Sequence, residues 1–170
     1  MYTYNYDFKR KRFRNFEKLF IRNTSRNSLI MRNKIPELES KICVVIAAYN
    51  EEKFIGRCLR SLLNQTLTKT LYEIIVVNDG SEDKTDYALS LFSDPKNSLL
   101  KIISNKKNIG LPASINIAIN KTNAKYIVRV DADDFVNKNF LEILRYYLDS
   151  NPLSDAVACD YYLLDDKEEV

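Results

Sequence analysis

The chain has 170 residues, enough for one domain of ordinary size, and its 45% hydrophobic and 29% charged residues are typical of a globular protein. It has no histidine, and its three cysteines, Cys43, Cys58 and Cys159, form no closely spaced pair, which argues against a zinc site and against histidine acid–base catalysis. No apolar run approaches the ~20 residues of a transmembrane helix, and the charged start lacks the apolar stretch of a signal peptide.

The net charge of +3 is unevenly distributed, because residues 1–34 are strongly basic. Phe13, Phe16 and Phe20 recur there at helical spacings, with arginine and lysine between them. Such a segment can be an amphipathic helix on an anionic membrane, a disordered leader, or a tail that meets nucleic acid. We favour the leader, keep peripheral membrane contact through residues 1–34 as the alternative, and expect no nucleic-acid partner.

A linker with Pro36 separates this leader, residues 1–40, from a domain that we expect over residues 41–170. In the domain, short apolar runs rich in β-branched residues alternate with segments of helical periodicity. Asn50 is the expected N-cap of the first helix. The expected strands span 41–48, 72–79, 99–106 and 125–134, the helical segments span 49–66, 80–94, 108–122 and 137–151, and 155–166 begins a fifth strand.

Strands that alternate with helices and are almost continuously apolar predict an α/β fold, with a mostly parallel sheet covered by helices on both faces. In such sheets ligands bind beyond the carboxyl ends of the strands. Each of the first four strands ends in polar residues, which we therefore expect to meet in one place. The candidates at these ends are Ala47, Tyr49, Glu51, Asp79, Asn105, Asp131, Asp133 and Asp134.

The carboxylates of the segment "DADD", residues 131–134, have two interpretations. A turn that caps the next helix needs only one aspartate. Three clustered carboxylates repel one another, and a divalent cation relieves that repulsion. Mg²⁺ takes one or two protein carboxylates together with substrate phosphates, so we favour a site for Mg²⁺ or Mn²⁺ on a diphosphate. The segment "NDGS" around Asp79 could be a simple tight turn, although a helix rather than a strand follows it.

Four segments together, "VVIAAYNEE", "IIVVNDGSEDKT", "NIGLPASINIAI" and "YIVRVDADDF", resemble the family 2 glycosyltransferases with the GT-A fold. The motifs occur in the family's order and spacing from about Lys41 to the C-terminus. The resemblance implies inverting transfer of a sugar from a nucleotide-sugar, usually a UDP-sugar, to a polysaccharide, glycan or lipid-linked acceptor, as in cell-surface polysaccharide biosynthesis. It also implies a cytoplasmic location, in contact with the inner face of the membrane if residues 1–34 bind lipid.

The resemblance also implies roles for the strand-end residues. Tyr49 corresponds to a residue that packs on the base, and Glu51 and Asp79 to residues that contact the base or ribose. Asp131 and Asp133 correspond to the two aspartates of the DxD motif, which hold the ribose and the Mg²⁺ or Mn²⁺ ion. Asp134 is a further expected metal ligand, and Ala47 lies at the same nucleotide-sugar-binding strand end.

Two departures from the family pattern stand out. Many members have arginine where this chain has Ile115. The catalytic base of the family lies on the acceptor side and is expected beyond Val170, since Asp160, Asp165 and Asp166 come too early to match it. We therefore expect the donor-binding part of a transferase, incomplete at the C-terminus, with a non-catalytic nucleotide-sugar-binding module as the alternative. An NAD-binding domain ranks low, because no GxGxxG motif follows the first strand.

Overall fold

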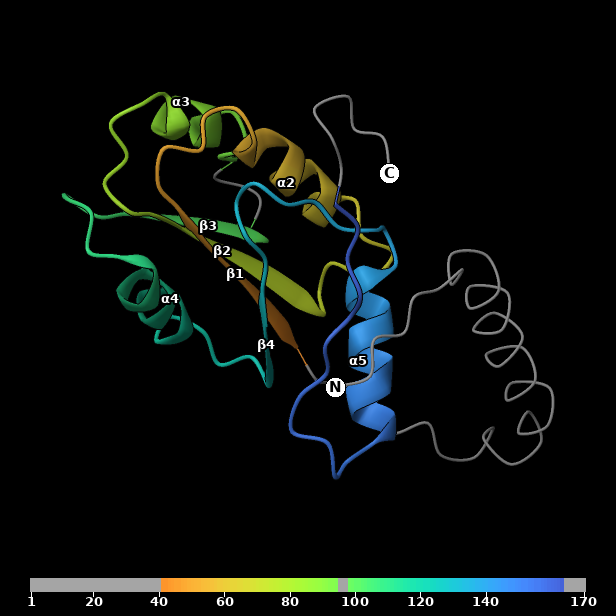
Figure 1. Ribbon diagram of the computed structural model, residues 1–170. Coiled ribbons are helices and arrows are strands. Elements are labelled where there is room, and N and C mark those ends of the chain that lie inside the picture. The colour runs from red at the N-terminus through yellow and green to blue at the C-terminus, as the bar shows by residue number, and fades with distance from the viewer. Residues whose placement is uncertain (1–40, 95–97, 164–170) are drawn as a thin grey trace, which may run out of the picture. The chain divides into compact units, whose positions relative to one another are not determined.

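A computed structural model describes residues 41–94 and 98–163 of the chain. The predicted leader over 1–40 lies outside the described residues. Within the described ranges strands and helices alternate, as the sequence predicts (Figure 1). The strands are β1 (Ile42–Ala48), β2 (Tyr72–Asn78), β3 (Leu100–Ser104) and β4 (Tyr126–Arg129), and the helices are α2 (Ile55–Leu63), α3 (Thr85–Ser90), α4 (Leu111–Ile119) and α5 (Phe140–Ser150).

The four strands form one sheet in the order β3-β2-β1-β4, and all three neighbouring pairs are parallel. The two central strands are buried almost throughout, with only Ala47 and Glu73 partly exposed. A strand covered on both faces has no solvent side for polar residues, which explains why these segments are continuously apolar. The predicted α/β fold with a parallel sheet is confirmed.

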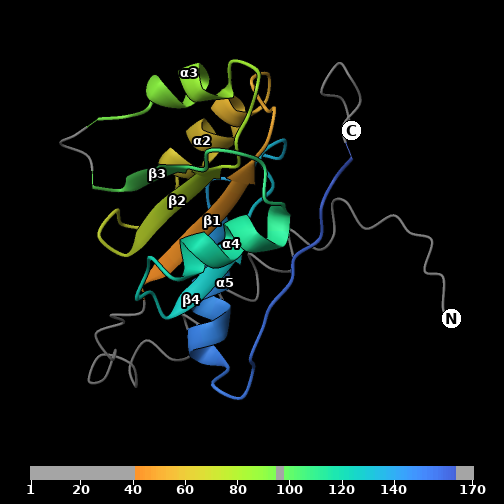
Figure 2. The ribbon, with the colours of Figure 1, turned by 90° about the vertical axis from the view of Figure 1, so that its left-hand side faces the viewer.

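Alternate side chains of the central strands enter two separate apolar clusters, one on each face of the sheet. Val44, Ile46 and Val76 pack on one face with residues of α2, α3 and α5. Val45 and Val77 pack on the other face with residues of α4. Figure 2 shows α4 in front of the sheet, with α2 behind it and α3 above the strands. Helices therefore cover both faces, as predicted.

The start of α2 corrects one prediction. Asn50 is not the N-cap, because α2 begins at Ile55 after a turn and Phe54 occupies the capping position. Asn50 instead has a φ of 59°, in the left-handed region that asparagine tolerates better than most residues. Its side-chain oxygen accepts a hydrogen bond from the backbone of Glu82, far along the chain. A long-range contact thus takes the oxygen that a capping asparagine would give to its own helix.

The predicted fifth strand is also wrong over the part that the structure describes. Residues 155–163 contain no strand, and most of them are exposed. Alternating hydrophobic and polar residues favour a strand only where a neighbouring strand accepts its backbone hydrogen bonds. In the described ranges β4 pairs with β1 alone, so residues 155–163 lie in no ladder.

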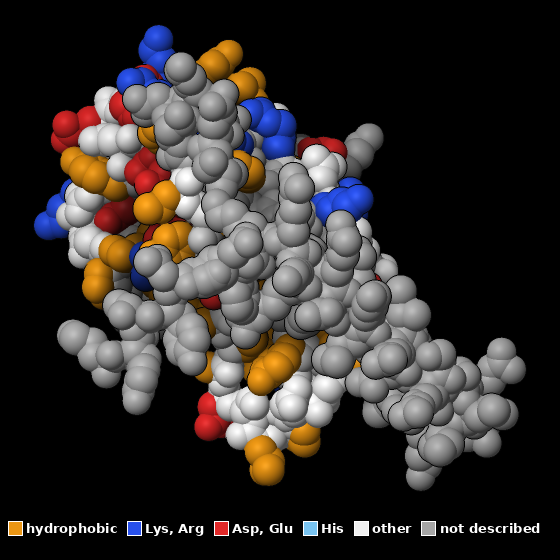
Figure 3. All heavy atoms as spheres, turned by 45° about the vertical axis from the view of Figure 1, so that its right-hand side comes forward, with side chains coloured by type: hydrophobic (Ala, Val, Ile, Leu, Met, Phe, Trp, Pro, Cys, Tyr) orange, Lys and Arg blue, Asp and Glu red, His pale blue; other side chains and the backbone are white. Residues whose placement is uncertain are grey.

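Several large hydrophobic side chains reach the surface, and Figure 3 shows such side chains among charged ones on one face. Leu153, Tyr161 and Leu163, after α5, are each more than four-fifths exposed. Among the described helices, none combines the length and the apolar character needed to cross a membrane.

Candidate functional site

The register of the sheet brings the strand ends to one edge. Ala48, the last residue of β1, lies opposite Asn78, and Asn78 lies opposite Ser104 at the end of β3. Beyond β4, the backbone N–H of Val130 donates to the carbonyl of Val45, so the chain still follows β1 as it enters the DADD turn. The polar residues predicted to converge therefore follow strands that end together.

The connection after β1 is held by the connection after β2. The backbone N–H of Asn50 donates to Ser81 Oγ over 3.0 Å, and that of Glu51 donates to Thr85 Oγ1 over 2.7 Å. In return, Asn50 Oδ1 accepts from the backbone N–H of Glu82 over 2.8 Å. Hydrogen bonds in both directions fix the relative position of the two connections.

Two further hydrogen bonds join the connections after β1 and β2, and together with the first three they form what we call the lock between these connections. The backbone N–H of Glu52 donates to Asp83 Oδ2 over 3.1 Å, and the backbone N–H of Lys84 donates to Glu52 Oε2 over 2.8 Å. The amides of Asn50, Glu51 and Glu52 are thus already occupied by side chains from the second connection. Residues 50–52 therefore offer side chains rather than backbone amides to a ligand, and the ring of Tyr49 beside them is 42% exposed.

Asp79 lies just after β2 and is only 2% exposed. Its Oδ1 accepts from Asn105 Nδ2 over 2.8 Å and from the Ile109 backbone over 3.0 Å, and its Oδ2 accepts from the Gly110 backbone over 2.8 Å. Burial alone would raise the pKa of Asp79, but the hydrogen bonds from Asn105, Ile109, Ser114 and Gly110 hold it below its ordinary value. The carboxylate therefore anchors the 105–110 loop.

Next to Asp79, Gly80 lets the connection after β2 approach the connection after β3 closely. Its φ is +69°, and a Cβ atom there would lie 2.4 Å from the carbonyl carbon of Lys107. A side chain at this position would thus be both strained and in collision with backbone.

The DADD turn follows β4. The backbone N–H of Asp134 donates to the carbonyl of Asp131 over 3.1 Å, which closes the turn. The guanidinium of Arg129 holds Asp131 Oδ1, with Nε at 2.9 Å and Nη2 at 2.6 Å. Both side chains of this ion pair are about half exposed, so it orients Asp131 more than it stabilises the fold.

The carboxylates of this region influence one another. Burial, and then the charges of Asp133 and Asp83, raise the pKa of Glu51. Burial, and then the charges of Asp133 and Asp131, raise the pKa of Asp134. The first connection and the DADD turn are therefore close enough to share one negative region. Below it, burial and the same aspartates raise the pKa of the Cys58 thiol to about 12, which makes this cysteine unreactive.

The carboxylate oxygens of the DADD turn suit a hard cation such as Mg²⁺ only when a bound ligand supplies further oxygen atoms. Within the described residues, no group of three or more His, Cys, Asp or Glu side chains could hold a metal ion by itself. Mg²⁺ commonly uses one or two carboxylates and completes its shell with phosphate oxygens and water. The oxygen-only side chains of Asp131, Asp133 and Asp134 fit that arrangement.

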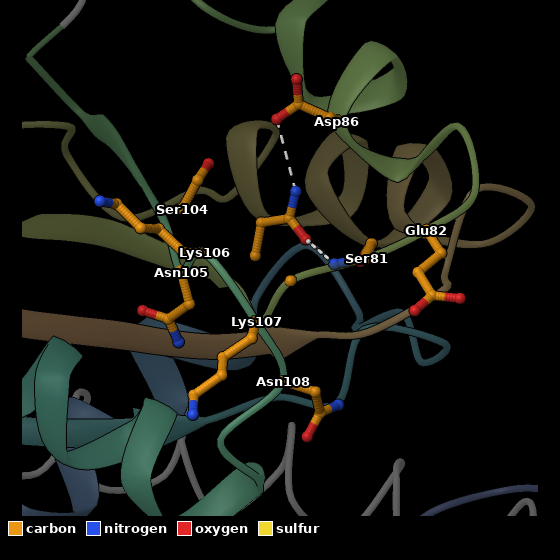
Figure 4. Close-up of a pocket in the computed structure, with 10 residues that line it drawn as sticks. Ser81, Glu82, Asp86, Ser104, Asn105, Lys106, Lys107 and Asn108 are labelled. Atoms are coloured by element: carbon orange, nitrogen blue, oxygen red, sulfur yellow. Dashed lines mark hydrogen bonds between the residues drawn. The ribbon is translucent and has the colours of Figure 1, made fainter.

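A polar hollow of about 470 Å³ lies next to Asp79, between the connections that follow β2 and β3. Figure 4 shows Ser81, Glu82 and Asp86 on one side and residues 104–108 on the other. Asn78 also lines it, accepting from the Ser81 backbone and donating to Asp86. Of the eight candidates at the strand ends only Asn105 lines this hollow, and none of the seven with a predicted binding or metal role does, so it is a neighbouring feature rather than the predicted crevice itself.

The structure thus places all seven predicted residues around one edge of the sheet, although with different accessibility. Tyr49, Asp133 and Asp134 are exposed, Ala47, Glu51 and Asp131 are half-buried, and Asp79 is buried. Sequence reasoning missed the residues that hold the loops in place, among them Thr85, Arg57 and Arg129. The only local signal was the aspartate-rich and hydroxyl-rich segment 81–86, which we interpreted as a helix start.

The fold and the polar strand ends define a parallel α/β domain with its candidate site at the carboxyl edge of the sheet. The model of glycosyl transferase family 2 matches residues 43–168, and the chain belongs to this family. An uncharacterized glycosyltransferase of Haemophilus influenzae is 37% identical over 127 residues, which is 75% of this chain and 38% of that protein. The poly(ribitol-phosphate) beta-N-acetylglucosaminyltransferase TarS of Staphylococcus aureus is 34% identical, over 65% of this chain and 19% of TarS.

Crystal structures of Staphylococcus aureus TarS, alone and in complex with UDP, match with a TM-score of 0.60 at 31% identity. The match covers 66% of this chain and 33% of that one, and a complex with UDP-GlcNAc matches equally well. A Pyrobaculum calidifontis mannosyltransferase in complex with GDP-Man and Mn²⁺ has the same TM-score at 22% identity over 64% of this chain, a likeness of fold alone. The GT-A fold is thereby confirmed, and the chain spans well under half the length of these proteins.

Proposed function

We propose that this chain binds a nucleotide-sugar donor, a UDP-sugar, and that the protein transfers the sugar to the hydroxyl of a polysaccharide, glycan or lipid-linked acceptor. The observation that carries the proposal is the convergence of Tyr49, Glu51 and the DADD turn at one edge of a parallel sheet, where ligands of α/β proteins bind. Support for UDP comes from TarS, a relative that has been crystallised with UDP and UDP-GlcNAc.

We assign the two sides of this edge to the two parts of the donor. The exposed ring of Tyr49 offers a stacking surface to the base, with Ala47 and Glu51 beside it. Asp79 contributes through the 105–110 loop that it anchors, in addition to any direct contact with the base. Asp131, which Arg129 orients, faces the ribose and diphosphate.

Asp133 and Asp134 would hold Mg²⁺ or Mn²⁺ against the diphosphate. A bound divalent ion supplies positive charge that stabilises the departing nucleoside diphosphate. The protein itself fixes the turn that carries these carboxylates and keeps their charges close enough to need a counterion. A reaction in which a metal ion stabilises the leaving diphosphate requires no histidine, and the chain has none.

Titration calorimetry tests the donor proposal directly. We expect UDP to bind at least about tenfold more tightly with Mn²⁺ than with a chelator, a difference of roughly 1.4 kcal/mol, and Asp133→Asn to remove most of the gain. Asp155→Asn, a change at an exposed aspartate after α5, is the matched control and should bind as the wild type does. Equal UDP affinity with metal and with chelator would refute the metal–diphosphate assignment. A radiolabelled donor with a panel of acceptors then separates binding from transfer.

A further inference from the structure

We propose that Arg57 is a positioning residue that holds the Asp133–Asp134 turn in the orientation needed to bind the metal–diphosphate. This inference rests on the proposed function, and it assigns a role outside the strand ends, to a side chain in the first turn of α2. Arg57 acts on the backbone and on a neighbouring ring of the turn, so it shapes the site without contacting the donor.

Arg57 contacts the turn in two ways. Its Nη2 donates to the backbone carbonyl of Asp133 over 3.1 Å. Its guanidinium also lies over the ring of Phe135, 4.6 Å from the ring centre. These contacts flank Asp134 on both sides, because one reaches the residue before it and the other reaches the residue after it. The hydrogen bond goes to a carbonyl, so it leaves the carboxylate of Asp133 outside the contact.

Other side chains of α2 hold the rest of the same segment. The Cys58 thiol donates to the carbonyl of Asp131, with 3.5 Å between sulfur and oxygen, and Ser61 Oγ accepts from the backbone N–H of Val136 over 3.1 Å. Just beyond the C-terminal end of α2, Gln65 Nε2 donates to the carbonyl of Asn137 over 2.9 Å. One stripe of α2, continued by Gln65, thus holds the backbone from residue 131 to residue 137, and Arg57 is its member beside the proposed metal aspartates.

The chemistry of arginine suits this position better than that of lysine. A guanidinium is flat, so it can lie on the Phe135 ring while one N–H points at a carbonyl in the same plane. The guanidinium also lies over the ring of Phe54, 5.8 Å from that ring's centre, and both rings are 43% exposed. The ammonium of lysine is a point charge that cannot make the stacked and the directed contact together.

The test compares Arg57→Lys with Arg60→Lys, a change at an exposed arginine three residues along the same helix. UDP affinity is measured by calorimetry with Mn²⁺ and with a chelator, and unfolding is followed in parallel. We expect Arg57→Lys to weaken UDP binding about tenfold in Mn²⁺, the scale seen when a group that orients metal ligands is changed. In chelator the same variant should change UDP affinity less than about twofold, because Tyr49 and the locked connections are untouched.

Two outcomes would overturn the inference. In the first, Mn²⁺ strengthens UDP binding to the wild type, but Arg57→Lys binds UDP as tightly as Arg60→Lys does. That result leaves the proposed function intact and removes the role of Arg57. In the second, the wild type binds UDP equally tightly with Mn²⁺ and with a chelator. That result removes the proposed metal–diphosphate function as well. If Arg57→Lys unfolds, Phe135→Leu removes the stacked ring at an exposed position and should show the same selective loss in Mn²⁺.

Discussion

Asp79 anchors the 105–110 loop from a buried position, with both carboxylate oxygens engaged. Replacing it with alanine would leave the donors on Asn105, Ile109 and Gly110 without their acceptor. We expect Asp79→Ala to lower the free energy of unfolding by about 2–3 kcal/mol, the usual cost of stranding buried polar groups. Denaturant unfolding measures this change, with Asp155→Asn as the control. A stability equal to that of the wild type would show that solvent replaces the carboxylate.

The lowered pKa of Asp79 also predicts a pH dependence. Because the folded pKa lies below the ordinary value of 3.8, the stabilisation is complete above that value and is lost as the pH falls through the folded pKa. Between about pH 6 and about pH 3, the wild type should therefore lose stability more steeply than Asp79→Asn, which has no proton to gain. Parallel unfolding curves for the two proteins over this range would contradict the assignment.

At the scale of elements, the lock between the connections after β1 and β2 depends on Thr85, which is fully buried. Its Oγ1 accepts from the Glu51 backbone and donates to Asp83 Oδ1. Valine has nearly the same shape but lacks the hydroxyl, so Thr85→Val should cost about 1–3 kcal/mol of unfolding free energy. Thr68→Val, at an exposed position, is the control. A Thr85→Val protein as stable as this control would show that the lock does not depend on the hydroxyl.

The elements were also where prediction from sequence succeeded most clearly. Continuous apolar runs identify β1 and β2, because a strand buried on both faces has no polar side to display. The same edge of a parallel sheet collects the strand ends, so the position of Tyr49, Glu51 and the DADD turn followed from the order of elements. Local patterns carry this information because burial repeats along the strand or helix itself.

What sequence reasoning missed are contacts between residues far apart in the chain. Asn50 looked like a local N-cap, yet its oxygen goes to Glu82, and no nearby pattern predicts such a partner. No sequence pattern pointed to Arg57, which donates to the backbone carbonyl of Asp133. The predicted strand over 155–166 failed where it is described, since pairing depends on a neighbour that periodicity does not reveal.

At the scale of the whole molecule, the basic segment 1–34 contrasts with the cluster of carboxylates at the sheet edge. Its interaction with lipid stays a prediction, which vesicle co-sedimentation of the full chain can test. Each Lys or Arg near an anionic surface contributes about 1 kcal/mol. Changing Arg10, Lys11, Arg12 and Arg14 to glutamine should therefore weaken binding to anionic vesicles by at least about tenfold.

Salt and lipid charge provide the controls for that experiment. Raising the ionic strength from about 0.1 M to about 1 M shortens the screening length from roughly 10 Å to roughly 3 Å, so electrostatic binding should be lost. Neutral vesicles should bind neither protein. Binding that survives both high salt and the four substitutions would assign the attraction to the aromatic residues instead.

The place of β1 between β2 and β4 has a consequence for the order in which a newly synthesised chain matures. Ribosomes release the chain from its N-terminus at roughly 5–20 residues per second, so β1, β2 and their locked connections emerge before β4 and the aspartate turn. The stripe of α2 that receives this turn is therefore made well before its partner. A nascent chain interrupted ahead of Tyr126 would carry the proposed base-binding side without the diphosphate-binding side.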